Sequence, residues 1–211
     1  MRLYIYEHCP FCLRTRMIAG FKNLPIQYSI IMEGDSETPT YLVGKKVVPI
    51  LHKPDGQYMT ESLDIVHYLD DLTPPAYATG EVDPKVQAWV KDSSNLIFRL
   101  IVSRFTRSDF KEISTPEARK AFIERETASF GDLDQIFSES AQDIVSMNEE
   151  LKKIEILIQD HTEINITDFI IFPWLRSLSI VKDLDFQPHT KRYMNRIATA
   201  AKVNLLFDQA I

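Results

Sequence analysis

The chain has 211 residues, of which 45% are hydrophobic and 26% are charged, and its formal net charge is −6 at pH 7. These are ordinary values for a globular protein, and the length fits one large domain or two small ones. The acidic balance argues against nucleic acid as a partner, because phosphate binding needs clustered positive charge. No run of about 18 apolar residues predicts a membrane helix.

The first 72 residues alternate between strand and helix patterns. A strand is expected at Arg2–Tyr6, and a helix at Pro10–Phe21, where the proline suits the first helical turn. The further elements expected here are strands at Ile26–Ile31, Val47–Leu51 and Gln57–Met59, a short helix or turn at Tyr41–Val43, and a helix at Ser62–Leu72. This order predicts a four-stranded sheet flanked by helices, with a right-handed first crossover.

The rest of the chain has helical patterns. Residues 73–84 begin with Thr73-Pro74-Pro75 and include Gly80, a composition typical of a linker. The helices expected after it are Pro84–Phe105, Thr115–Phe137, Ala141–Asp160, Thr167–Val181 and Pro188–Lys202. The sequence therefore predicts an α/β domain at residues 1–72, a linker at 73–84 and an all-helical domain at 85–211.

The only two cysteines lie three positions apart in Cys9-Pro10-Phe11-Cys12, directly after the first strand. They are too few and too close for the disulfide framework of a secreted protein, and the N-terminus has no secretory signal pattern. A reducing cytoplasm is therefore expected, where such a pair beside a strand-helix-strand unit indicates thiol–disulfide exchange.

The position of the pair assigns a role to each thiol. Cys9 is expected at the start of the helix, where backbone N–H groups and the helix dipole stabilise a thiolate. Cys12 lies one turn further on and is expected to be more buried. Cys9 is thus predicted to attack a disulfide, and Cys12 to resolve the resulting mixed disulfide.

Zinc is the main alternative for two cysteines at this spacing. A structural zinc site needs about four ligands, usually with a second pair of Cys or His residues. His8 is adjacent to Cys9, but the other histidines form no such pair; they are His52, His67, His161 and His189. No metal is expected, and His8 is interpreted as a polar neighbour of the reactive thiol.

Two later dipeptides fit a ligand beside the cysteines. If the Val48-Pro49 bond is cis, the backbone of Val48 is free to pair with a peptide; an ordinary trans proline at a strand start is the alternative. Glu61-Ser62 begins a helix, where free N–H groups and a hydroxyl suit a carboxylate and Glu61 suits an ammonium group. Ordinary helix capping is the alternative for this second pair.

These motifs together resemble the glutaredoxin and glutathione-transferase branch of the thioredoxin fold. The cysteine motif, the Val-Pro pair and the Glu-Ser pair occur in the family's order, and the helical second half is similar to that of the larger bacterial glutaredoxins, the glutaredoxin 2 type. Three further segments carry the resemblance across the chain: Met17-Ile18-Ala19-Gly20-Phe21-Lys22-Asn23, Ser114-Thr115-Pro116-Glu117-Ala118-Arg119-Lys120 and Phe172-Pro173-Trp174-Leu175-Arg176-Ser177-Leu178.

The resemblance implies glutathione as co-substrate and partner. By it, Cys9 forms the mixed disulfide, Val48 with Pro49 pairs with the cysteinyl part, and Glu61 and Ser62 hold the γ-glutamyl end. Phe11 walls the site where many glutaredoxins carry tyrosine, so a hydroxyl contact is absent. No residue is assigned to the carboxylate of the glycine end of glutathione. Lys45 and Lys46 are the candidates.

The implied function is a glutathione-dependent reductase of protein disulfides and glutathione mixed disulfides, acting as a monomer. Two other functions stay open: glutathione transfer to electrophiles, and redox sensing without turnover. In the helical part, Asn165 and Asp168 are expected to form a capping box, and Arg104 is expected to face the cleft between the domains.

Overall fold

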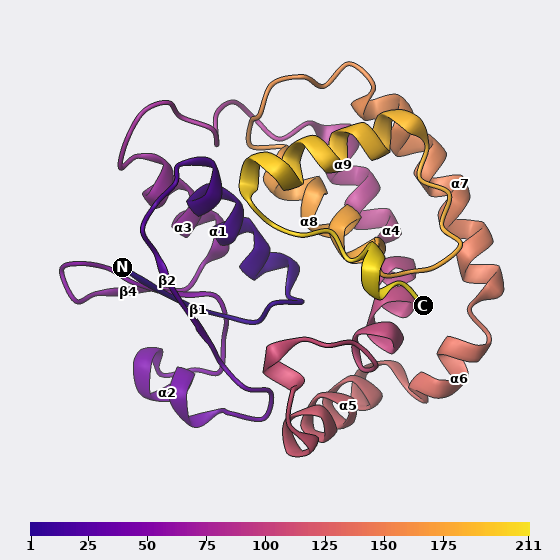
Figure 1. The fold of residues 1–211 in the computed structure, drawn as a ribbon, viewed down its shortest axis with the longest axis horizontal. Coiled ribbons are helices and arrows are strands. Elements are labelled where there is room, and N and C mark those ends of the chain that lie inside the picture. Colours follow the sequence, from indigo (N-terminus) through magenta and orange to yellow (C-terminus); the bar gives the residue numbers. More distant parts are fainter.

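The structure is a computed structural model that describes residues 1–211, and it divides into a mixed α/β part and a helical part (Figure 1). The first part contains β1 (Arg2–Ile5), α1 (Pro10–Phe21), β2 (Gln27–Ile30), α2 (Glu37–Val43), β3 (Ile50–His52), β4 (Tyr58–Met59) and α3 (Ser62–Asp70). The second contains α4 (Pro84–Phe105), α5 (Pro116–Phe130), α6 (Leu133–Ser138), α7 (Ala141–Ile158), α8 (Asp168–Leu178), α9 (Pro188–Ala201) and the short 3-10 helices η1 (Lys111–Ile113) and η2 (Phe207–Gln209). The predicted fold class, an α/β thioredoxin-like domain followed by helices, is confirmed.

The sheet has the strand order β2-β1-β3-β4. β1 pairs in parallel with β2 across the connection through α1, and pairs antiparallel with β3, which in turn pairs antiparallel with β4. Alternate residues of β1, Leu3 and Ile5, are buried, as expected for a strand that packs helices on its face. The central position of β1 places the turn that follows it, and hence Cys9, at one end of the sheet.

Several predicted bounds differ from the structure; α2, for example, begins at Glu37 and not at Tyr41. β3 begins at Ile50 and not at Val47, because Pro49 has no N–H to give to the sheet. The single helix expected at Thr115–Phe137 is two helices, since Gly131 takes a positive φ of 89° and ends α5. Asp132 then caps α6 by accepting hydrogen bonds from the backbone N–H groups of Asp134 and Gln135.

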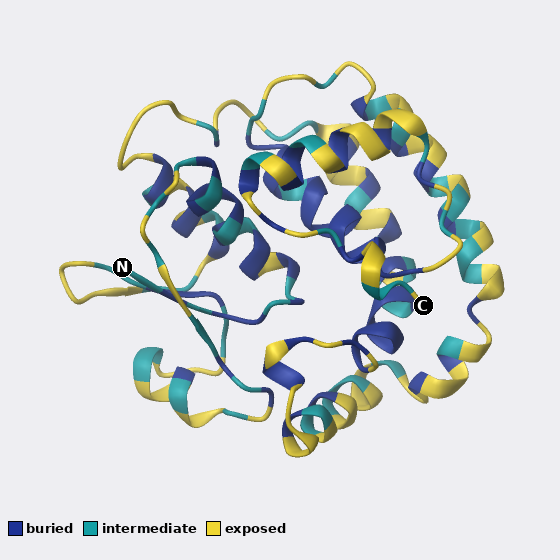
Figure 2. Cartoon of the chain, in the orientation of Figure 1, coloured by how far each residue is buried: buried dark blue, intermediate teal, exposed yellow.

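One continuous hydrophobic core crosses both parts of the chain. α8 is buried along nearly its whole length, and the inner faces of α1 and α4 are buried as well, whereas the outer faces of α5 and α7 are exposed (Figure 2). No helix combines the length and the apolar composition needed to cross a lipid bilayer.

The connection between the two parts, residues 71–83, has no helix or strand, in the region predicted to be a linker. It is nevertheless tied to the α/β part by a buried carboxylate. Asp70 accepts hydrogen bonds from the backbone N–H groups of Tyr77 and Ala78 and forms an ion pair with Lys22 at 3.2 Å. The connection is thus held in place by side chains of α1 and α3.

The backbones of α1 and α9 approach each other closely at Gly20 of α1. A Cβ atom at this position would overlap the carbonyl group of Ala201, the last residue of α9. Only glycine permits this distance between α1 and α9, because every other side chain begins with a carbon in that space.

Gly20→Ala is therefore expected to destabilise the protein by about 1–3 kcal/mol, the usual cost of overpacking. Glycine-to-alanine changes inside helices otherwise stabilise by up to about 1 kcal/mol, so the sign of the effect reports the contact with Ala201. The measurement is the urea unfolding midpoint. A Gly20→Ala variant as stable as the unmodified protein would contradict the close packing of α1 on α9.

Candidate functional site

The two cysteines occupy different environments at the N-terminus of α1. Both are free thiols; Cys9 is the N-cap residue and half-buried, whereas Cys12 is fully buried in the first turn. Pro10 occupies the first helical position, so the helix begins directly after Cys9. The backbone N–H of Cys12 donates to Cys9 Sγ at 3.5 Å, and the backbone N–H of Tyr6 donates to Cys12 Sγ at 3.5 Å. Only the thiol of Cys9 is thus placed to meet another molecule.

These environments move the two thiol pKa values in opposite directions. The Cys12 thiol donates a hydrogen bond to Cys9, and this bond is the largest influence on the pKa of Cys9. Burial raises that pKa, whereas the charge of His8 and the backbone N–H groups lower it further. The net result is a Cys9 pKa lowered to about 7. Burial raises the pKa of Cys12 well above its usual value, and the neighbouring Cys9 raises it further. Near neutral pH a large share of Cys9 is thiolate while Cys12 keeps its proton, the asymmetry that thiol–disulfide exchange requires.

His8, directly before Cys9, is fixed by a carboxylate of the helical part. Its Nδ1 lies 2.6 Å from Oε1 of Glu112 in η1, and its backbone N–H donates to the same oxygen at 2.9 Å. Burial of Glu112 opposes its charge, but the hydrogen bond and the charge of His8 lower the pKa of Glu112 below its ordinary value. The cysteine motif is therefore attached to a residue 104 positions away in the sequence.

One side of the site is formed by Phe11, which is 41% exposed. Its ring makes an edge contact with Trp174 of α8, at 6.0 Å between ring centroids, and the guanidinium of Arg14 lies over its face at 4.9 Å. Arg14 also donates to the carbonyl of Phe169 at 2.9 Å and to Ser62 Oγ at 3.3 Å. Arg14 thereby links the cysteine helix to α3 and to α8.

The Val48–Pro49 peptide bond is cis, which was one of the two alternatives left by the sequence. Extending the β1–β3 register by two pairs beyond Tyr4 and Ile50 places Val48 opposite Tyr6, at the end of β1 that leads to Cys9. The backbone N–H and C=O groups of Val48 have no hydrogen-bond partner within the chain. A pocket of about 330 Å³ opens here, lined by Tyr6, Pro39, Lys46, Val47, Val48 and Arg125.

Glu61 and Ser62 begin α3 as expected. Glu61 is the N-cap, but its side chain accepts no capping hydrogen bond, so the N–H groups of the first turn are not used within the chain. The exposed Glu61 carboxylate instead lies 3.8 Å from Lys45. Ser62 is buried, and its hydroxyl is held by Arg14. The start of α3 therefore offers free N–H donors beside an acidic side chain.

Known proteins share this arrangement over the whole chain. Residues 85–210 match the family model described as "Glutaredoxin 2, C terminal domain", and residues 3–77 match "Glutathione S-transferase, N-terminal domain". Glutaredoxin 2 of Escherichia coli strain K12 is 38% identical over 215 residues, which cover 100% of both chains. The solved structure of glutaredoxin 2 from Salmonella typhimurium, in complex with glutathione, has a TM-score of 0.95 at 38% identity and covers 100% of this chain and 98% of that chain.

The chain belongs to the glutaredoxin 2 family. It is thus a glutathione-dependent thiol–disulfide oxidoreductase, the activity that the cysteine pair and the accompanying motifs predict. Glutathione S-transferase omega-1 from Sus scrofa is more distantly similar, with 24% identity over 92% of this chain and 75% of its own length.

Sequence reasoning missed two contributors to this glutaredoxin site, Glu112 and Trp174, and misplaced a third residue. Glu112 carries no local signal, since its partner His8 is distant in the sequence, and no local pattern pairs Trp174 with Phe11. Arg104 does not face the cleft between the domains. Its guanidinium is buried in the helical part, where it donates to the carbonyls of Leu100 and Ile211.

The start of α8 has only one half of the predicted capping box, because Thr167 is the N-cap residue and the side chain of Asn165 does not bond the N–H of Asp168. The Asp168 carboxylate accepts from the backbone N–H of Asn165 at 2.8 Å, and Asn165 Oδ1 accepts from the backbone N–H of Thr167 at 2.9 Å. Asp168 also accepts from the hydroxyl of Tyr193 at 2.8 Å and contacts His161 at 3.0 Å. These bonds join α8 to α9 and serve the fold of this glutaredoxin, not its chemistry.

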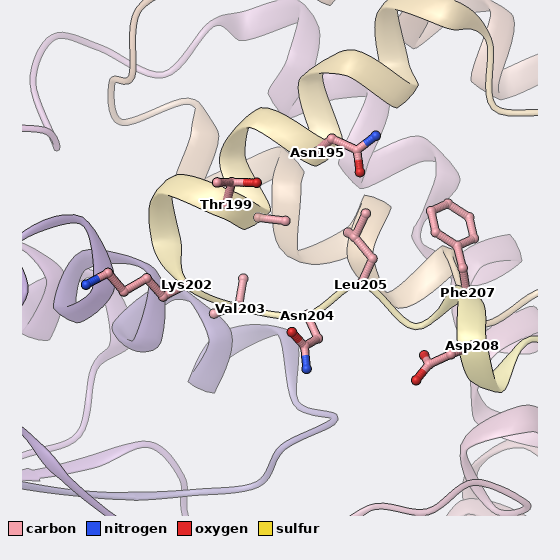
Figure 3. A pocket seen from close by; sticks show the side chains of 9 residues that line it. Asn195, Thr199, Lys202, Val203, Asn204, Leu205, Phe207 and Asp208 are labelled. Carbon is pink, nitrogen blue, oxygen red and sulfur yellow. The ribbon is translucent and has the colours of Figure 1, made fainter.

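A further cavity of the glutaredoxin is lined by none of the residues of the cysteine motif. It measures about 610 Å³ and lies along α9 and the segment after it, where Asn195, Lys202, Asn204 and Asp208 are among the lining side chains (Figure 3). None of the predicted site residues lines it. No group of three or more His, Cys, Asp or Glu side chains is arranged to hold a metal ion.

Alkylation of the reduced protein with iodoacetamide is expected to modify Cys9, with a rate that rises with pH through a midpoint near 7. Cys12 is expected to stay unmodified in the folded protein because it is buried and protonated. The modified peptide is assigned by mass spectrometry over a pH series. In a Cys12→Ala variant the midpoint moves upward, because the hydrogen-bond donor to the thiolate is lost. A midpoint at the ordinary thiol value, or faster modification of Cys12, would contradict this assignment.

Proposed function

We propose that Cys9 is the nucleophile of this glutaredoxin and that Cys12 is its resolving thiol. The observation that carries the proposal is the contrast between the two thiols at the start of α1. Cys9 is half-buried and has a pKa lowered to about 7, whereas Cys12 is fully buried and hydrogen-bonded to Cys9. A thiolate that is accessible beside a protonated thiol suits attack first and resolution second.

With a glutathionylated protein, the Cys9 thiolate attacks the sulfur of the glutathione moiety. The protein leaves as a thiol, and glutathione stays bound to Cys9 as a mixed disulfide. A second glutathione thiolate then attacks that glutathione sulfur, which releases glutathione disulfide and restores the Cys9 thiolate. One disulfide bond is exchanged for another: the substrate sulfur is reduced to a thiol, and the one free glutathione thiol that is consumed is oxidised into glutathione disulfide, so the electrons balance.

With a protein disulfide, Cys9 attacks one sulfur and forms a mixed disulfide with the substrate. Cys12 loses its proton and attacks Cys9 Sγ, which releases the reduced dithiol and closes a Cys9–Cys12 disulfide. Two glutathione molecules reopen it through the same mixed disulfide. The hydrogen bond between the two thiols supports this second step, because it already holds the sulfur atoms side by side.

Glutathione is proposed to bind across the end of β1, in contact with three segments. The unpaired backbone of Val48, next to Pro49, suits the cysteinyl peptide groups, and the start of α3 at Glu61 and Ser62 suits the charged γ-glutamyl end. Phe11 covers the ligand from the side of α8. The Salmonella relative supports glutathione as the ligand, because its solved structure is a complex with glutathione.

The glycine carboxylate is proposed to lie toward Lys46 and not toward Lys45. Lys46 lines the pocket beside Val48, whereas Lys45 lies beside Glu61 at 3.8 Å. The substrates are proposed to be cytoplasmic proteins that carry disulfides or glutathione mixed disulfides, and the enzyme is proposed to act as a monomer. The two free cysteines, which are too few for the disulfide framework of a secreted protein, support a reducing compartment.

Replacement of each cysteine separately tests the proposed roles. Cys9→Ser is expected to abolish both reduction of a protein disulfide and removal of glutathione from a glutathionylated peptide. Cys12→Ser is expected to lose the first reaction and retain the second, which needs only one thiol of the enzyme. Both rates are followed by coupled oxidation of NADPH through glutathione reductase. Retained activity in Cys9→Ser would refute the nucleophile, and faster turnover of a chlorinated aromatic acceptor than of disulfides would favour a transferase.

Ser62→Ala tests the glutathione site. Loss of a hydroxyl that bonds a charged group costs about 1.5–3 kcal/mol, so KM for glutathione is expected to rise by roughly 10-fold or more. The pH midpoint of Cys9 alkylation in the absence of glutathione stays unchanged. Ser114→Ala, which removes an exposed serine hydroxyl at the end of η1, is the matched control and leaves KM unchanged. An unchanged KM in Ser62→Ala would refute this part of the site.

A further inference from the structure

Glu112 is a fully buried carboxylate that approaches the cysteine motif from the helical part. Its Oε1 accepts from the backbone N–H of His8 at 2.9 Å and lies 2.6 Å from Nδ1 of the same residue, while its Oε2 has no hydrogen-bond partner. A buried carboxylate with one unpaired oxygen is costly unless a nearby positive charge compensates it. The group in direct contact that can carry this charge is the imidazole of His8.

Aromatic side chains surround His8 on the sides that Glu112 does not contact. The ring is buried among aromatic side chains whose centroids lie within 5.8 Å of its own; they are Tyr6, Phe105, Phe110 and Phe122. Aromatic faces attract a cation, and here they replace part of the hydration that burial removes. The carboxylate supplies the larger part of the compensation, because it is the group that carries a full opposite charge.

We propose that Glu112 is a positioning residue for the thiol chemistry: it holds His8 protonated and oriented, and the imidazolium of His8 in turn stabilises the thiolate of Cys9. The inference deepens the proposed function and rests on Cys9 as the nucleophile. It gives the helical domain a part in setting the reactivity of a thiol that belongs to the other domain. Glu112 contacts neither substrate nor Cys9, so its effect passes through His8.

Other charged and titratable groups lie near Glu112, His8 and Cys9. They are the same in the protein and in the variants compared below. Cys12 and Arg14 act on Cys9 from α1 itself, and the charge of Glu112 acts on Cys12. The groups that act on Glu112 or its surroundings from other elements are Tyr6 at the end of β1, Arg176 in α8, and the Glu33–Arg125 ion pair at 2.7 Å. None of them donates a hydrogen bond to Glu112.

The sign of the effect separates this role from a simple charge effect. Removal of a negative charge near Cys9 acts directly by stabilising the thiolate, which would shift its alkylation midpoint to lower pH. Glu112→Gln is expected to do the opposite. A neutral His8 no longer supports the thiolate, so the midpoint is expected to move upward by about one pH unit, and the alkylation rate at acidic pH to fall by about 10-fold.

The experiment measures iodoacetamide alkylation of the full-length reduced protein over a pH series, with assignment of the modified peptide. His8→Asn is expected to raise the midpoint by a similar amount, and the Glu112→Gln/His8→Asn double variant is expected to add nothing further. Lys111→Gln is the matched control, because it breaks only the neighbouring exposed pair with Glu7, at 3.3 Å, and leaves the midpoint in place.

The outcomes are distinguishable. If iodoacetamide alkylates a residue other than Cys9 in the protein without substitutions, Cys9 is not the nucleophile and the proposed function is refuted. Modification of Cys9 with a midpoint that Glu112→Gln lowers or leaves unchanged would overturn the inference alone. Should Glu112→Gln fail to fold, His8→Asn decides: an upward shift supports the role of the imidazolium, and an unchanged midpoint overturns it.

Discussion

The helix that carries both cysteines packs against both parts of the chain, and the geometry of the site depends on this packing. α1 contacts α3 on one side and α8 and α9 on the other. Gly20 allows the close approach to α9, and Arg14 at the opposite end binds a carbonyl of α8. Rotation or translation of α1 would therefore disturb the core of both domains. A helix fixed in this way presents its first N–H groups, and the thiolate that they stabilise, at a defined place.

The electrostatics of the thiols follow from the same packing. Cys12 is buried because the first turn of α1 faces the sheet, and burial keeps its thiol protonated and able to donate to Cys9. Cys9 lies one residue before the helix, so its sulfur is only half covered. The difference in burial and pKa between the two thiols thus results from three positions in the sequence and the direction in which one helix is packed. His8 adds a contribution that the local sequence does not contain, because its partner Glu112 lies in the other domain.

The sequence predicted what local rules determine. The bounds of α1 and α4 follow from a proline at the first turn and from apolar spacing, and the deeper burial of Cys12 follows from its position along one helix. The break between α5 and α6 was missed, although Gly131 and Asp132 give a local signal for it. The pairings between Glu112 and His8 and between Trp174 and Phe11 were not predictable by these rules. Such contacts depend on how two domains meet, and a single sequence without an alignment holds no record of which distant residues touch.

The shared interface also explains why a glutaredoxin can use a second domain that contributes no cysteine. In a thioredoxin-like domain alone, the side of α1 that faces α8 would be open to water, and Phe11 would lack its aromatic neighbour. Here Trp174 supports the Phe11 ring, and Arg14 links that ring to the start of α3, where glutathione is proposed to bind. Water is kept from one side of the thiolate, which strengthens the interactions of the remaining charges with it. The helical domain is therefore part of the site's physical environment, and its loss would alter the chemistry of Cys9 as well as the stability of the fold.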